Sequence, residues 1–193
     1  MTHAPLLDLI ATRHARVGVI GLGYVGLPLA LTAAQAGFRV TGFDIDPAKI
    51  TAITARQSYI EAAPDAVLAA EVDAGRFTAT TDFTTLGASD VIVICVPTPL
   101  TRHREPDLTY ITRTCDDIAK TLRPGQLIAL ESTTYPGTTD GPVRTILERT
   151  GLRSGQDFFL GFSPEREDPG FWFAHRPRST HWMNGSSVYW PIH

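Results

Sequence analysis

The sequence has little cysteine and no long apolar run. Its only two cysteines, Cys95 and Cys115, lack metal-ligand spacing and are too few for a disulfide framework, which suits a reducing cytoplasm. No run of about 18 apolar residues occurs, and Asp8 interrupts the short apolar patch near the N-terminus, so we expect neither a membrane span nor a signal peptide. The net charge of -3 gives no reason to expect nucleic acid or an anionic membrane as a partner.

Lysine is also scarce. Of the 17 basic residues only Lys49 and Lys120 are lysines, a bias typical of GC-rich bacterial coding. Hydrophobic residues make up 43% of the chain and charged residues 19%, which is the globular range. A chain of 193 residues can build one good-sized core, so we expect a single domain.

Apolar segments of strand length alternate with helical patterns. The expected strands are 16–20, 39–43, 76–80, 91–96, 126–130 and 158–162, and the expected helices are 24–36, 47–56, 61–74, 109–121 and 139–150. The strands are almost continuously apolar, as in parallel strands covered on both faces. We therefore predict an α/β fold, a Rossmann-type doubly wound parallel sheet of about six strands. Residues 1–15 form an N-terminal extension, in which 3–14 read as a short amphipathic helix packed on the domain.

A glycine triplet follows the first expected strand. Gly21, Gly23 and Gly26 satisfy G-x-G-x-x-G, in which the glycines permit a tight turn, close approach of a pyrophosphate, and packing of helix on strand. The next strand ends at Asp44, where a carboxylate would accept hydrogen bonds from the adenosine ribose and repel a 2′-phosphate. The pattern favours NAD over NADP. The alternative is a plain tight turn, with Asp44 capping the following helix.

Polar segments follow three later strands. Thr98 follows the fourth strand, 132–134 the fifth and 163–167 the sixth. Ligands bind at the carboxyl ends of parallel strands. We therefore expect these segments to converge beside the glycine loop at residues 21–26, which we call the phosphate loop. Each segment taken alone is also ordinary turn chemistry.

Together these segments resemble a known family. "VGVIGLGYVGLPLA", "GFDID", "VPTPL", "ESTTYPGTT" and "GFSPEREDPG" occur in this order, and the set is similar to the NAD-binding domain of the nucleotide-sugar (UDP-glucose/GDP-mannose) 6-dehydrogenases. The resemblance covers about residues 15–170, and we expect the NAD-binding Rossmann domain at 16–170. Its "ESTTYPGTT" and "SPEREDPG" segments look more like the UDP-N-acetylglucosamine branch than the UDP-glucose branch.

The resemblance implies an oxidoreductase of polysaccharide biosynthesis, in which two NAD molecules oxidise the CH2OH of a UDP-sugar to a carboxylate. A cysteine holds the intermediate as a thiohemiacetal and then as a thioester, which water hydrolyses. Thr133 would position that water and Glu165 would act as the acid/base residue. The implied cofactor-binding residues are Gly21, Gly23, Tyr24, Val25, Gly26, Asp44, Lys49, Thr98 and Thr133. The plainer alternatives are a solvated loop carboxylate for Glu165 and a surface lysine for Lys49.

The family's catalytic-cysteine domain and its dimer-forming central helix have no counterpart here. Cys95 lies in an apolar strand, and Cys115 lies beside Asp116, whose charge would raise the thiol pKa. We therefore expect the chain to be inactive alone, with a non-catalytic NAD-binding or interaction module as the alternative. A third interpretation, another Rossmann oxidoreductase with a truncated substrate domain, is weaker because all five segments occur in order.

The sequence changes character at Phe171. Residues 171–193 hold all three tryptophans, lack periodicity and have no acid or lysine, so we expect an aberrant, poorly ordered tail. Our hypothesis is a frameshift, tested by translating the other two frames past the Gly170 codon; the alternative is a genuine short protein with a novel tail. His175, His181 and His193 match no metal-site spacing, so no metal is expected.

Overall fold

The computed structural model describes residues 4–99 and 106–163. Its centre is a sheet of six parallel strands in the order β3-β2-β1-β4-β5-β6. The strands are β1 (Arg16–Ile20), β2 (Arg39–Phe43), β3 (Phe77–Thr80), β4 (Val91–Ile94), β5 (Leu127–Leu130) and β6 (Phe159–Phe162). The helices are α1 (Ala4–Ala11), α2 (Gly26–Gln35), α3 (Pro47–Thr54), α4 (Asp65–Asp73), the 3-10 helix η1 (Phe83–Ala88), α5 (Thr109–Ala119), the π-helix η2 (Thr139–Val143) and α6 (Arg144–Glu148). The predicted doubly wound sheet is confirmed.

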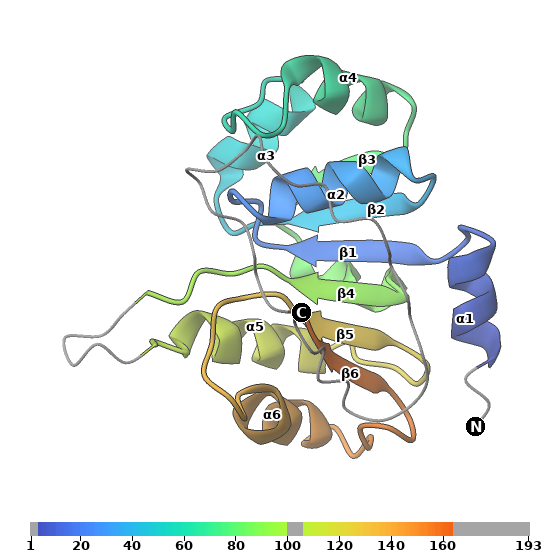
Figure 1. Cartoon of the computed structure of the whole chain (residues 1–193), viewed down its shortest axis with the longest axis vertical. Helices are drawn as coiled ribbons and strands as arrows, with labels where there is room; N and C mark the ends of the chain where they lie inside the picture. Colours follow the sequence, from blue (N-terminus) through green and yellow to red (C-terminus); the bar gives the residue numbers. More distant parts are fainter. Residues whose placement is uncertain (1–3, 100–105, 164–193) are drawn as a thin grey trace, which may run out of the picture.

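The helices form a layer on each face of the sheet (Figure 1). Helices α2 and α4 pack over β1 to β3, where Leu27 and Leu68 join Phe77 in one buried cluster. Helices α5 and α6 pack with β4 and β5, where Ile111 and Ile128 belong to a second cluster. Both faces are therefore buried, which explains why the strands are so uniformly apolar.

The strand order reverses at β1. From β1 the chain passes through α2 to β2 on one side of it, and returns after β3 to form β4 on its other side. The loops that follow β1 and β4 therefore diverge at the carboxyl edge of the sheet, the usual ligand position in such folds. Helix α1 lies near the opposite, amino edge (Figure 1), and it confirms the short N-terminal helix.

Two predicted helices differ from expectation at their N-terminal ends, and proline explains both. The helix predicted from residue 61 begins at Asp65 because Pro64 occupies the position before it. The helix predicted over 139–150 opens with the π-helix η2, which contains Pro142. A proline has no N–H and cannot join the regular hydrogen-bond ladder, so α6 forms only after it.

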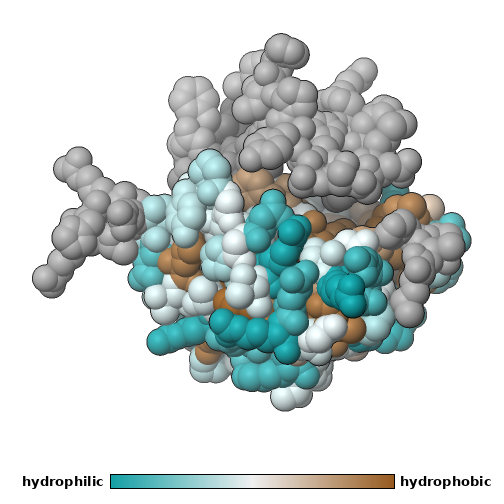
Figure 2. Space-filling model, turned by 90° about the horizontal axis from the view of Figure 1, so that it is seen from below, coloured by the Kyte–Doolittle hydropathy of each residue, from teal (hydrophilic) through white to brown (hydrophobic). Residues whose placement is uncertain are grey.

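The lower face of the molecule, on which α6 lies, is mainly hydrophilic, with apolar residues in small separate patches (Figure 2). Scattered apolar residues are normal for a solvent-exposed surface. Within 4–99 and 106–163, no helix combines the length and the apolar character needed to cross a membrane.

Candidate functional site

Two glycines of the turn from β1 into α2, Gly21 in the loop and Gly26 at the first position of α2, are required by the turn itself. Gly21 has φ +89°, and a Cβ on it would lie 2.7 Å from the carbonyl oxygen of Cys95. A Cβ on Gly26 would overlap the carbonyl oxygen of Gly21. The loop can therefore turn this tightly against β4 only with glycine at both positions.

The middle glycine has a different environment. A Cβ on Gly23 would meet no described atom within 4 Å, so packing does not explain the missing side chain. No side chain caps the start of α2, and such a helix end attracts anions. The two residues after Gly23 differ in exposure: Tyr24 is 71% exposed, whereas Val25 packs on the core. Open space beside Gly23 and an uncapped helix start suit a diphosphate.

Asp44 is buried at the end of β2 and bonds to the phosphate loop. Its Oδ2 accepts a hydrogen bond from the backbone N–H of Leu22 at 2.8 Å and pairs with Lys49 Nζ at 2.7 Å. Its Oδ1 accepts from the backbone N–H of Asp46 at 3.0 Å. The alternative role of Asp44 as the cap of α3 is not what the structure shows, because Asp46 caps that helix through Ala48 N at 2.9 Å.

Tyr59 contacts the same loop and was missed at the level of sequence. Its hydroxyl donates a hydrogen bond to the carbonyl oxygen of Leu22 at 2.8 Å. Burial, and then the charges of Asp44 and Asp46, raise the pKa of the phenol well above its ordinary value. Tyr59 lies in the connection between α3 and α4, which carries no motif, so no sequence signal identified it.

The loops after β4 and β5 are joined to each other. Thr98 Oγ1 donates to the carbonyl oxygen of Thr133 at 2.5 Å. The buried Ser132 donates through Oγ to the carbonyl oxygen of Val96 at 2.8 Å. The structure thus brings Thr98 and Thr133 together, as predicted from their places at neighbouring strand ends. Glu165 lies outside the described residues, as does the whole of 171–193.

No thiol is placed for nucleophilic chemistry. Cys115 is fully buried in α5, and burial, with a smaller effect of Asp116, raises its pKa to about 12. Cys95 is also buried, beneath the phosphate loop against Gly26. A buried thiol is a poor nucleophile. Within the described part of the chain, no group of three His, Cys, Asp or Glu side chains could hold a metal ion.

Comparison with known families agrees with this geometry. Residues 15–176 match the family "UDP-glucose/GDP-mannose dehydrogenase family, NAD binding domain". The chain belongs to this family. The sheet and its glycine loop are thus the family's NAD-binding domain, and the dehydrogenase resemblance of the sequence is confirmed.

Named relatives from this dehydrogenase family are similar over the same region. A UDP-N-acetyl-D-glucosamine 6-dehydrogenase of Pseudomonas aeruginosa is 39% identical over 159 residues, 82% of this chain and 37% of the relative. The structure of the UDP-D-ManNAc dehydrogenase of Pyrococcus horikoshii superposes with a TM-score of 0.76 at 39% identity, covering 80% of this chain and 37% of that one. A ternary complex of GDP-mannose dehydrogenase from Pseudomonas aeruginosa gives 0.74 at 34% identity, covering 78% and 36%. The chain therefore spans little more than a third of the length of these relatives.

Proposed function

We propose that the glycine loop, Asp44 and Lys49 bind NAD, and that the domain serves the oxidation of a UDP-sugar. The observation that carries the proposal is the contrast among the glycines. The loop needs Gly21 and Gly26 for its own packing, whereas Gly23 faces open space beside an uncapped helix start. Backbone N–H groups there can reach a diphosphate, and a side chain would block its approach.

Asp44 has room for one more hydrogen bond. An ionised carboxylate accepts about four hydrogen bonds, and three are already made, from Leu22 N, Asp46 N and Lys49 Nζ. The remaining position suits a ribose hydroxyl, and Lys49 can donate to the same sugar. A 2′-phosphate would face the carboxylate, which favours NAD over NADP.

The remaining residues are assigned by their places around the loop. Tyr24 and Val25 follow Gly23 and would line the diphosphate, and Thr98 would lie near the cofactor. The exposed Thr133 would position the hydrolytic water, and Glu165 would serve as its acid/base partner. NAD, when bound, supplies a hydride acceptor; the residues of this chain hold and orient it.

UDP-N-acetylglucosamine is the preferred substrate and UDP-glucose the second candidate. The name of the Pseudomonas aeruginosa relative supports the first, as do the segments around Thr133 and Glu165. The described residues present no exposed thiol, so we expect the chain to bind NAD without turning over a UDP-sugar alone. The buried thiol of Cys115, outside any disulfide, suits action in the cytoplasm.

The deciding experiment is calorimetric titration of the whole chain with NAD. Wild type should bind, and Gly23→Ala should lower the affinity at least about tenfold, since a methyl group displaces the diphosphate, with the melting temperature unchanged. Gly141→Ala is the matched control, because a Cβ there also meets nothing within 4 Å. No NAD binding by wild type, or equal binding by Gly23→Ala, would overturn the proposal.

A second assay tests catalysis separately. The chain is mixed with NAD and either UDP-N-acetylglucosamine or UDP-glucose, and NADH is followed by its absorbance. We expect no NADH. Steady NADH formation would show that the chain is catalytic by itself, and would leave the assignment of the cofactor site intact.

A further inference from the structure

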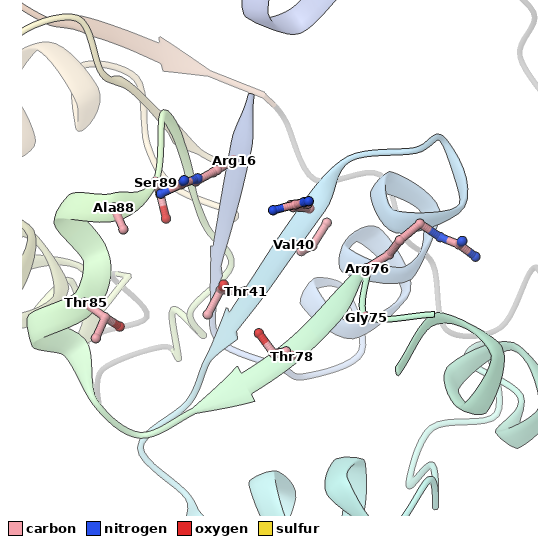
Figure 3. Close-up of a pocket in the computed structure, with 10 residues that line it drawn as sticks. Arg16, Val40, Thr41, Gly75, Arg76, Thr78, Thr85, Ala88 and Ser89 are labelled. Atoms are coloured by element: carbon pink, nitrogen blue, oxygen red, sulfur yellow. The ribbon is translucent and has the colours of Figure 1, made fainter. Parts of the chain in front are cut away.

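A hollow lies at the amino edge of the sheet, away from the glycine loop between β1 and α2. It has a volume of about 250 Å³ and lies between η1 and the starts of the first three strands. Figure 3 shows Thr85 and Ala88 of η1 on one side, and Thr41 and Thr78 of β2 and β3 on the other. The crossover from β3 to β4 is the short helix η1, so the sheet is left partly open here.

Two arginines lie side by side at the rim of this hollow. Arg16 and Arg39 are direct register partners on β1 and β2, and both line the hollow. Like charges directly opposed on neighbouring strands destabilise a sheet. Neither guanidinium forms an ion pair with a carboxylate of the described residues. The pair is thus a local excess of positive charge at the sheet edge.

The nearby charges are already paired with one another. Arg76, next to this pair, binds Glu71 through two hydrogen bonds of 2.6 and 3.0 Å, and its side chain points away from the hollow (Figure 3). Asp90 pairs with Arg123 at 2.7 Å. The other carboxylate oxygen of Asp90 accepts a hydrogen bond from the backbone N–H of Arg16 at 2.9 Å, and neither Glu71 nor Asp90 forms an ion pair with the guanidinium of Arg16 or Arg39.

Hydroxyl groups line the same face just beyond the arginines. Gly18, Thr41 and Thr78 are register partners across β1, β2 and β3. Gly18 and Thr41 lie two residues after Arg16 and Arg39, and residues two apart in a strand share a face of the sheet. The hydroxyls of Thr41 and Thr78 bond to no other described residue, whereas Ser89 reaches toward Gly18, where a Cβ would lie 2.7 Å from its Oγ. The Oγ of Ser89 thus occupies the space left by the missing Gly18 side chain, and Ser89 lines the hollow together with Thr41 and Thr78.

We propose that this hollow binds a small phosphate-type oxyanion, either inorganic phosphate or diphosphate or the phosphate group of a small molecule. Guanidinium groups match phosphate oxygens with paired donors, and hydroxyls complete such a site. Sites for drug-sized ligands usually span about 300–1,000 Å³, so this hollow suits a small ion and not a whole dinucleotide. The anion also relieves the repulsion between Arg16 and Arg39.

The test is titration of the whole chain with inorganic diphosphate in phosphate-free buffer, with NAD at saturation so that the cofactor loop is occupied. Wild type should bind diphosphate, and Arg16→Gln combined with Arg39→Gln should weaken binding at least about tenfold. NAD affinity should not change. Arg153→Gln, an exposed arginine outside the hollow, is the matched control and should behave as wild type.

Thermal melting gives an independent measure. Without anions, Arg39→Gln should melt at or above the wild-type temperature, because it removes a like-charge contact. Diphosphate should raise the melting temperature of wild type but not of the double variant. The proposal is overturned by three results: no diphosphate binding at millimolar concentration, equal weakening by Arg153→Gln, or loss of diphosphate binding once NAD is present. A titration with UDP tests whether a nucleotide phosphate serves as well as the free ion.

Discussion

The hydroxyl of Tyr59 donates to the carbonyl oxygen of Leu22 at 2.8 Å, while Asp44 accepts from the N–H of the same residue at 2.8 Å. The Leu22 side chain is fully buried, and it packs so closely on Gly42 that a Cβ there would lie 2.8 Å from Leu22 Cδ2. Leu22 is thus held by backbone and side chain. Leu22 lies between Gly21 and Gly23, so these contacts hold the phosphate loop in place before a ligand binds. A loop that is already ordered lowers the entropic cost of binding.

Removing the Tyr59 hydroxyl should weaken cofactor binding without unfolding the domain. Tyr59→Phe removes one hydrogen bond, worth about 0.5–1.5 kcal/mol, so we expect NAD affinity to fall between about twofold and tenfold. Calorimetry measures it, with Tyr110→Phe as control, since Tyr110 is 41% exposed in α5. A fall in melting temperature with unchanged NAD affinity would mean that Tyr59 only supports the fold.

Neutralising Asp44 should change cofactor choice. Asp44→Asn removes the charge that faces a 2′-phosphate and leaves Lys49 without its carboxylate partner, so NAD affinity should fall about tenfold or more and the preference over NADP should shrink. Titrations with both dinucleotides measure the ratio. Asp46→Asn is the control, because asparagine caps α3 as well as aspartate. An unchanged ratio of the two affinities in Asp44→Asn would contradict the role given to this carboxylate.

Gly26→Ala should damage the fold itself. The added Cβ would overlap the carbonyl oxygen of Gly21, so the loop must shift, and we expect a loss of at least about 2 kcal/mol in the free energy of unfolding. Urea denaturation measures it, beside Gly23→Ala and Gly141→Ala, which should keep nearly wild-type stability. Equal stability of all three variants would show that the loop adapts freely.

Cys115 should stay unreactive in the native state and should make stability pH-dependent. Its pKa rises from 9.0 to about 12, so between these values the unfolded thiol loses its proton while the folded thiol keeps it. The unfolded state then binds fewer protons, and stability falls as pH rises through this window. Cys115→Ala should flatten the fall in urea melts. Tyr59, whose pKa is also raised, acts in the same direction, so Tyr59→Phe is measured beside it. Rapid labelling of Cys115 in the native protein at neutral pH would contradict its predicted lack of reactivity.

The sequence by itself determined the layered sheet and the glycine loop. Apolar runs such as 17–20 favour strands covered on both faces, and the spacing of Gly21, Gly23 and Gly26 is a local steric requirement. The meeting of Thr98 and Thr133 also followed, because neighbouring parallel strands end at one edge. The late start of α4 was foreseeable from Pro64 but was not predicted.

Only the tertiary structure decided what surrounds that loop. Tyr59 reaches Leu22 across 37 residues of sequence, and no periodicity or motif connects them. Asp46, not Asp44, caps α3, because the buried carboxylate of Asp44 bonds to Leu22 and Lys49 instead. The opposition of Arg16 and Arg39 depends on strand register, which the packing of the whole sheet selects. Local steric requirements and apolar periodicity can be recognised in the sequence, whereas contacts between distant residues form only when the core packs.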